Sequence, residues 1–139
     1  MPKFSKSNMK ELKKLLYNSC VHDASMENLE YRCREDCIKI ELLHPYFNYQ
    51  LDMTFHNIEL VFAKKGQELG SRETVISLTV EEDYSYLQTY LSKCNEYPEN
   101  ALYLLFQMLS GNELHIVSKE VTVEINGLNI FRAKNDIVQ

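Results

Sequence analysis

Glycine and proline are scarce in this chain, with four glycines and three prolines among 139 residues. Together with 45% apolar and 25% charged residues, this composition is that of an ordinary globular protein and excludes a disordered one. The chain is also long enough to bury a core without metal or disulfide crosslinks. No segment repeats at a fixed period. We therefore predict a single domain over residues 1–139.

Long hydrophobic runs are absent too. The longest strongly apolar run, Ala101 to Phe106, is too short to cross a bilayer as a helix, so no membrane partner is expected. The first twenty residues lack the uninterrupted apolar stretch and the cleavage site of a secretory signal, which predicts a cytoplasmic protein. Without export, the four cysteines are expected to stay reduced.

Basic residues are few outside the N-terminal segment. Residues 1–20 carry five lysines and one glutamate, whereas the rest of the chain carries ten basic and nineteen acidic residues, giving a net charge of −5. Nucleic-acid affinity comes largely from lysine and arginine, so the acidic body argues against a nucleic-acid partner. The basic segment fits either a helix that touches an anionic partner or the solvated face of an amphipathic helix, and we favour the solvated face.

The N-terminal segment has the pattern of a helix. Asn8 followed by Glu11 has the form of a capping box, which predicts a helix from about Met9 to Asn18, within residues 7–19. Apolar residues recur there at helical spacing: Met9, Leu12, Leu15, Leu16 and Cys20. Because Lys10 and Lys14 point away from this stripe, the helix should cover a sheet.

From residue 25 to residue 131 the hydrophobic period is two, which predicts a body made of strands. Alternation indicates strands over residues 29–33, 38–42, 49–55, 58–62, 74–80, 102–108, 114–117, 121–125 and 128–131. Turns are expected at 34–36, at His56-Asn57, at 110–112 and at Asn126-Gly127. The first hairpin has one apolar and one charged face, as in an antiparallel sheet that is solvated on one side.

The fold class that follows is α+β, mainly β: an antiparallel meander or open sandwich of about eight strands with an N-terminal cover helix. The first strand of the hairpin 102–117 is largely apolar on both faces, so we place it centrally in the sheet or between layers. Residues 81–94 fit either a short helix or a strand extension, and we favour the helix.

A zinc site can be drawn from four residues: Cys20, His22, Cys33 and Cys37. Zinc hairpins normally place two residues between ligands, and the alternation of the strands already explains a buried Cys33. Buried thiols are therefore the favoured interpretation, and no cofactor is predicted.

No catalytic motif is complete. The pair His22-Asp23 also occurs in metal phosphohydrolases, but those enzymes need further ligands on helices that this chain does not offer, so we read the pair as a polar junction. Ser110 lacks the flanking glycine of a nucleophile elbow. The remaining histidines, at 44, 56 and 115, are expected to be surface or hydrogen-bonded residues. We predict no enzymatic activity.

One stretch has the character of a binding surface. It consists of three acids and two nearby tyrosines: Glu81, Glu82, Asp83, Tyr84 and Tyr86. Tyrosine gives a large contact area at low entropic cost, and carboxylates steer a basic partner. The same pattern also fits tyrosines packed partly into the core beside acids that solvate an edge.

The chain resembles small β-rich bacterial families of unknown function, some of which are immunity proteins of polymorphic toxin systems. Four motifs carry the resemblance from His22 to Glu124: His22-Asp23, Leu29-Glu30-Tyr31, Met53-Thr54-Phe55 and the hairpin 109–113. The resemblance implies a protein that binds and blocks a cognate toxin and has no catalytic residues. A basic toxin would suit the acidic body, whereas the basic first helix is not accounted for.

The leading hypothesis is therefore a protein-binding module, immunity-like, whose acidic tyrosine-bearing surface meets a basic partner. One alternative is a small-ligand or metal-binding domain with a cavity between sheet and helix. Another is a self-associating structural protein, a homo-oligomer, because an open sheet leaves edges that can pair between copies.

Overall fold

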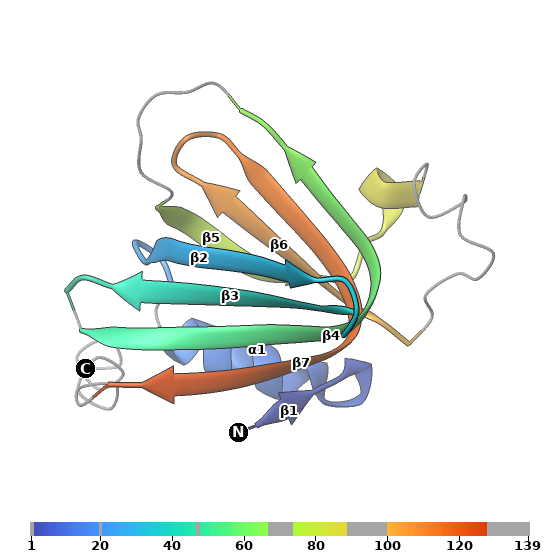
Figure 1. Ribbon diagram of the computed structural model, residues 1–139, viewed down its shortest axis with the longest axis horizontal. Helices are drawn as coiled ribbons and strands as arrows, with labels where there is room; N and C mark the ends of the chain where they lie inside the picture. Colours follow the sequence, from blue (N-terminus) through green and yellow to red (C-terminus); the bar gives the residue numbers. More distant parts are fainter. Residues whose placement is uncertain (1, 20, 47, 67–73, 89–99, 128–139) are drawn as a thin grey trace.

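The computed structural model describes residues 2–19, 21–46, 48–66, 74–88 and 100–127 (Figure 1). Its elements in chain order are β1 (Lys3–Phe4), η1 (Lys6–Asn8), α1 (Met9–Asn18), β2 (Ser25–Arg32), β3 (Cys37–His44), β4 (Tyr49–Lys64), β5 (Val75–Glu81), η2 (Ser85–Leu87), β6 (Leu102–Met108) and β7 (Glu113–Asn126). None of the helices in these ranges has the length and apolarity needed to cross a membrane.

All strands belong to one open antiparallel sheet. Their order is β2-β3-β4-β7-β6-β5, and the short β1 pairs with β7. Two meanders, β2-β3-β4 and β5-β6-β7, are thus joined by the pairing of β4 with β7. The predicted fold class, a mainly antiparallel sheet with an N-terminal helix, is confirmed, and β6 lies inside the sheet as predicted.

Within the described ranges the sheet has seven strands where about eight were predicted for the whole chain, and two long strands each replace a pair of expected short ones. The expected turn at His56-Asn57 is wrong: both residues lie inside the sixteen-residue β4. Asn57 takes a φ of 55°, a left-handed conformation that asparagine tolerates, and the register with β7 shifts between Ile58 and Leu60. The residues that were expected to form a turn therefore lie at a bend within β4.

β7 likewise unites the two strands expected at 114–117 and 121–125. Lys119 Nζ lies 3.8 Å from Glu59 Oε1 beside the bend, in a cross-strand ion pair. Because β4 and β7 bend together, the sheet folds into two halves that face each other (Figure 1). The hairpin expected beyond Asn126-Gly127 lies outside the described residues.

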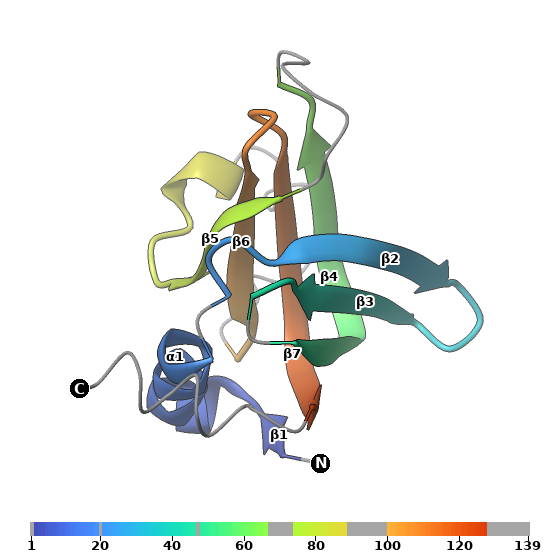
Figure 2. The ribbon, with the colours of Figure 1, turned by 90° about the vertical axis from the view of Figure 1, so that its left-hand side faces the viewer.

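Most buried side chains fill the space between the two halves, including Phe55 from β4 and Phe106 from β6, whose rings meet edge to face. α1 covers one end of this core through the buried Leu12 and Leu16, whereas Lys10 and Lys14 are exposed, as predicted (Figure 2). The prediction that Asn8 and Glu11 form a capping box at the start of α1 is wrong.

Asn8 does precede α1, but its side chain caps the preceding turn instead. Its Oδ1 accepts a hydrogen bond from the backbone N–H of Ser5 at 2.7 Å, and its Nδ2 donates one to the carbonyl of Lys3 at 3.1 Å. No side-chain hydrogen bond from Asn8 caps α1. The amide is committed to the β1–η1 connection, which explains why the box with Glu11 does not form.

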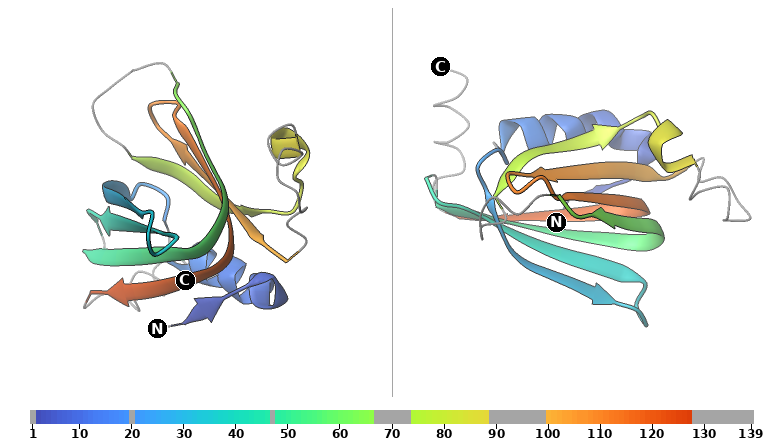
Figure 3. Two further views of the ribbon diagram at one scale, coloured as in Figure 1. Left: turned by 45° about the vertical axis from the view of Figure 1, so that its right-hand side comes forward. Right: turned by 90° about the horizontal axis from the view of Figure 1, so that it is seen from above.

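β2 departs from the expectation that its apolar face is buried. Leu29 and Tyr31 are 45% and 48% exposed, although their cross-strand neighbours Ile40 and Ile38 are buried. β2 is an edge strand, and the β2–β3 hairpin projects past the rest of the sheet, so little packs over its outer end (Figures 2 and 3). The start of β2 is tied across the fold by a bridge between Ser25 and Thr74.

A smaller cluster lies on the outer face of the β4-β7-β6 half. It consists of Leu87, Ala101, Tyr103 and Val117. Leu87 belongs to η2, a 3₁₀ turn that is followed by the helical Gln88. Of the helix expected within 81–94, residues 89–94 lie outside the described residues. The η2 turn positions the candidate site.

Candidate functional site

A cavity of ≈ 330 Å³ opens on this outer face, where β5 ends. Its lining combines acidic and aromatic side chains from β5, the η2 segment, β6 and β7: Glu81, Asp83, Ser85, Tyr86, Tyr103, Leu105, Glu113 and His115. Three of the five residues predicted to bind a partner therefore line one cavity, namely Glu81, Asp83 and Tyr86. We call this lining the acidic tyrosine site.

Strand alternation places these side chains together. In the antiparallel register, Tyr103 lies opposite Glu81 on β5, and Leu105 lies opposite His115 on β7. Since successive side chains of a strand point to opposite faces, Leu104 and Phe106 enter the main core while Tyr103 and Leu105 face the cavity. β6 thus contributes side chains to both the main core and the acidic tyrosine site.

A hydrogen-bonded chain forms the floor of the site. The hydroxyl of Tyr103 lies 2.5 Å from Nδ1 of His115, and Nε2 of His115 lies 2.9 Å from Oε1 of Glu113. An ionised carboxylate only accepts hydrogen bonds, so Nε2 carries a proton, and in the neutral imidazole Nδ1 then accepts from the tyrosine hydroxyl. Tyr103 and His115 are each 2% exposed. These hydrogen bonds, together with burial, therefore hold the rings of Tyr103 and His115 in place.

Tyr86 lies over this floor. Its ring stacks on that of His115, with centroids 5.2 Å apart, and Phe62 makes a tilted contact with the same imidazole at 5.5 Å. Tyr86 is nevertheless 52% exposed. The imidazole is covered by two rings, and Tyr86 presents aromatic surface to solvent beside the cavity.

The carboxylates make the site strongly acidic. Asp83 accepts hydrogen bonds from the Ser85 hydroxyl at 2.7 Å and from its backbone N–H at 2.9 Å, and these bonds lower the pKa of the Asp83 carboxyl. Burial, reinforced by the negative charges of Glu81 and Glu113, raises the pKa of Tyr103 to about 12. At neutral pH the tyrosine is therefore a neutral hydrogen-bonding group among anions.

The other two predicted binding residues have different positions. Tyr84 packs against the outer cluster, its ring 5.6 Å from that of Tyr103, and its hydroxyl donates a hydrogen bond to the carbonyl of Ala101 at 2.8 Å. Glu82 is paired with Lys13 of α1 at 3.3 Å. The alternative interpretation, tyrosine packed partly into the core, thus describes Tyr84 but not Tyr86.

The structure does not bring together the residues of the imagined zinc site. His22 precedes β2, whereas Cys33 and Cys37 flank the turn at its far end, separated from His22 by a strand of about 25 Å. Cys20 lies outside the described residues. Across the described ranges, no three His, Cys, Asp or Glu residues are placed to share a metal ion.

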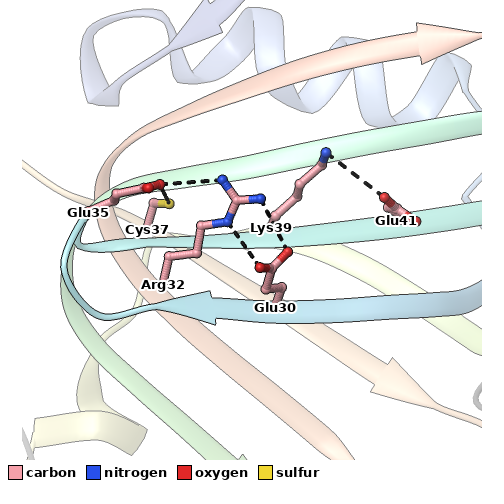
Figure 4. A network of polar contacts seen from close by, with 6 residues as sticks. All are labelled: Glu30, Arg32, Glu35, Cys37, Lys39 and Glu41. Atoms are coloured by element: carbon pink, nitrogen blue, oxygen red, sulfur yellow. Dashed lines mark hydrogen bonds and ion pairs between the residues drawn. The ribbon is translucent and has the colours of Figure 1, made fainter.

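Cys37 instead belongs to a polar network on the β2–β3 hairpin (Figure 4). Arg32 lies between Glu30 and Glu35, with nitrogen–oxygen distances of 3.1 and 3.4 Å, and the Cys37 thiol lies 3.8 Å from Glu35. Burial raises the pKa of the Cys37 thiol, and the nearby Glu35 charge adds to the effect. Cys37 is buried, but Cys33 is exposed, so only one of these two thiols matches the expected burial.

His22-Asp23 forms a polar junction. His22 Nδ1 lies 2.7 Å from the carbonyl oxygen of Ile76, and the backbone N–H of Asp23 donates to the carbonyl of Val75 at 2.9 Å. Asp23 takes a φ of 72°. The pair therefore acts as a polar junction, as the sequence interpretation proposed, and the structure adds that its partner is the start of β5.

The sequence interpretation missed Tyr103, Glu113 and His115. Glu113 and His115 stand two apart on one strand, which is a readable sign that they share a face. Their connection to Tyr103, twelve residues before His115, depends on the β6–β7 register and on which face η2 covers. That information lies in the packing of the sheet and not in the local pattern.

The sequence matches no protein-family model and no curated protein. The chemistry of the site therefore rests on its geometry. Three carboxylates, from Glu81, Asp83 and Glu113, surround a cavity beside an exposed aromatic ring. Such a lining attracts an organic cation, because carboxylates pair with it and the ring face interacts with it favourably.

Proposed function

We propose that this protein is a protein-binding module whose acidic tyrosine site receives a basic side chain of its partner. The observation that supports the proposal is that Glu81, Asp83 and the half-exposed Tyr86 line the same cavity. An arginine side chain suits this lining best, because its planar guanidinium can pair with carboxylates and stack on a tyrosine ring at the same time.

The hydrogen bonds that link Tyr103, His115 and Glu113 beneath the cavity support a binding role. Because Tyr103 and Glu113 both bond His115, their side chains are held in place before a partner arrives, which reduces the entropy lost on binding. The acidic body adds long-range attraction for a basic partner and raises the association rate. This electrostatic part of the affinity weakens as salt screens it.

The resemblance to immunity families gives the proposal a more specific form, in which the partner is a basic toxin and binding blocks its activity. The test is co-expression. A partner gene that arrests bacterial growth on its own should become harmless when this protein is co-expressed, and the Glu81→Gln/Asp83→Asn variant should protect less well. A partner that never affects growth would leave the binding function standing and exclude the immunity role.

Paired affinity baits test the binding function itself. One bait is the wild-type chain, and the other carries Glu81→Gln, Asp83→Asn and Tyr86→Ala. We expect the wild type to retain a stoichiometric basic protein that the variant loses and that high salt releases. Equal recovery by both baits, or a partner whose binding ignores salt, would refute the proposal.

A second candidate function is the binding of a small apolar anion. A second cavity, of ≈ 310 Å³, is lined mainly by apolar side chains, among them Met26, Leu29, Met108 and Leu114. Its charged lining residues are Lys64, Lys65 and Glu113, the last shared with the acidic tyrosine site. This volume lies at the lower end of small-molecule sites. Titration with dodecanoate tests it: saturable binding that Leu29→Glu, at an exposed lining residue, abolishes would support the ligand function, and no detectable binding would exclude it.

A further inference from the structure

A groove runs between α1 and the edge strand β5, next to the acidic tyrosine site. Its volume is ≈ 450 Å³, and its lining is mainly apolar, with Leu16, Tyr17 and Val21 on one side and residues 76–80 on the other. Lys13, which is paired with Glu82, and His22 complete the lining. Tyr17 and Ile76 are 74% and 43% exposed. At its far end β5 reaches Glu81, the first residue of the acidic tyrosine site.

The wall that β5 contributes is the edge of the strand. Five consecutive residues line the groove, although alternate side chains of a strand point to opposite faces. A groove can touch all of them only by lying along the backbone edge. β5 therefore presents main-chain groups and side chains to the same hollow.

This edge is hydrogen-bonded over a short stretch only. β6 pairs with β5 on its inner side. On the outer side, Val75 exchanges backbone hydrogen bonds with Asp23 and Ala24, and the carbonyl of Ile76 bonds His22. Within the part of the chain that the structure describes, residues 77–81 make no backbone hydrogen bond on that side. An unpaired edge of this kind is a template for another strand.

We infer that β5 accepts an extended segment of the partner as an added strand, with alternate side chains in the α1–β5 groove and a basic residue at the acidic tyrosine site. The main chain then supplies affinity, while the groove and the carboxylates supply specificity. The inference rests on the proposed function, because Glu81 and Asp83 set the charge of the residue at the end of the segment.

Charge favours a partner over a second copy of this chain. β5 carries no lysine or arginine, so a β5–β5 pairing would bring no basic residue from that strand to Glu81 and Asp83. A segment of another protein that alternates apolar and polar residues and ends in arginine can make all three interactions. Its main chain bonds the β5 edge, its apolar side chains enter the groove, and its arginine reaches the acidic tyrosine site. Self-association through β5 is a contrary outcome of the tests.

The first experiment selects twelve-residue peptides from a random display library against the full chain. We expect enrichment of alternating apolar residues followed by arginine or lysine. On binding the selected peptide, those backbone amides of residues 77–81 that point away from β6 should shift in NMR spectra and exchange more slowly with deuterium. No enrichment, or a selected peptide that binds without protecting these amides, would overturn the inference.

Two matched variants locate the strand. Ile76→Arg places a charge in the groove, and Leu29→Arg makes the same change at a similarly exposed residue on the opposite edge strand. The selected peptide should bind Ile76→Arg at least about tenfold more weakly and Leu29→Arg as tightly as the wild type. The reverse order would move the segment to β2 and refute the inference.

The Glu81→Gln/Asp83→Asn variant separates this inference from the proposed function. If that variant loses the peptide while Ile76→Arg keeps it, the acidic site binds a cation but β5 adds no strand. If Ile76→Arg loses it while the acidic variant keeps it, the proposed function fails. A wild-type dimer in analytical ultracentrifugation that Ile76→Arg dissociates would assign the groove to a second copy and overturn the inference.

Discussion

The ring of Tyr86 lies nearly parallel to that of His115, with centroids 5.2 Å apart and an interplanar angle of 14°. This contact connects the most exposed ring of the acidic tyrosine site to the buried floor, since His115 bonds both Tyr103 and Glu113. Tyr86 is thus held in one orientation by a ring that is itself fixed. The consequences for binding and stability can be measured separately.

Replacing Tyr86 tests whether its ring contributes to binding. We expect Tyr86→Phe to bind the partner nearly as well as the wild type, because the phenyl ring keeps the stacking surface. Tyr86→Ala should weaken binding by about 1–2 kcal/mol, since it removes the aromatic face offered to a cation. Calorimetric titration of both variants measures this difference. Similar losses in the two variants would show that the hydroxyl matters and the ring does not.

The Tyr103–His115 bond should show as coupling in a double-mutant cycle. His115→Phe removes the acceptor of the buried tyrosine hydroxyl, so we expect a loss of about 1–3 kcal/mol in the free energy of unfolding. In the Tyr103→Phe background the same replacement should cost less, because no hydroxyl is left unsatisfied. Urea unfolding of the four proteins gives the coupling. Additive effects would contradict the bond.

Tyr103 should keep its proton far into the alkaline range. Burial, together with the charge of Glu81, raises its pKa to about 12, from 10 for an isolated tyrosine. Carbon-13 NMR of ζ-labelled tyrosine follows the titration of the phenol directly. Glu81→Gln should lower the pKa, because one of the anions that oppose ionisation is removed. A Tyr103 signal that titrates near 10 in the folded wild type would contradict the burial of its hydroxyl beneath the acidic tyrosine site.

His44 should make stability depend on pH. Burial lowers the pKa of this histidine below its usual 6.5, although its hydrogen bond to the carbonyl of His22 opposes the shift. As pH falls through about 6.5 the unfolded chain binds a proton that the folded protein resists, so stability decreases toward acid and is regained above that pH.

Urea midpoints between about pH 5 and pH 7.5 test this dependence. The neutral variant His44→Gln should lose part of the slope seen in the wild type. His56→Gln is the matched control, because His56 lies half-buried on the same sheet and bonds Thr122. Equal slopes in the wild type and His44→Gln would mean that His44 does not resist protonation.

Local patterns predicted the elements well but not where the chain turns back. Alternation identified the strands from Tyr49 to Phe62, and the Asn57 turn signal was real, since that residue does adopt a positive φ. Whether a left-handed asparagine reverses the chain or only bends it depends on a partner strand. Here β7 pairs with β4 on both sides of the bend, and the strand continues.

Burial was harder to predict than strand identity. Leu29 and Ile40 are cross-strand neighbours on one face, yet Leu29 is 45% exposed and Ile40 is fully buried. The difference arises from the position of β2 at the sheet edge, which alternation cannot reveal. For the site, composition located Glu81, Asp83 and Tyr86, whereas the Tyr103–His115 contact required the register between the consecutive strands β6 and β7, which local alternation does not give.

The most direct test of the account compares two charge-neutralising pairs in one binding measurement. Glu81→Gln/Asp83→Asn changes the acidic tyrosine site, and Glu27→Gln/Glu30→Gln removes the same charge from exposed positions on β2. We predict that the first pair weakens affinity for the captured partner by at least about tenfold and reduces its salt dependence, while the second pair changes affinity less than about twofold. Equal losses of affinity in the two pairs would show that only net charge matters. This result would contradict the claim that the partner binds at the acidic tyrosine site.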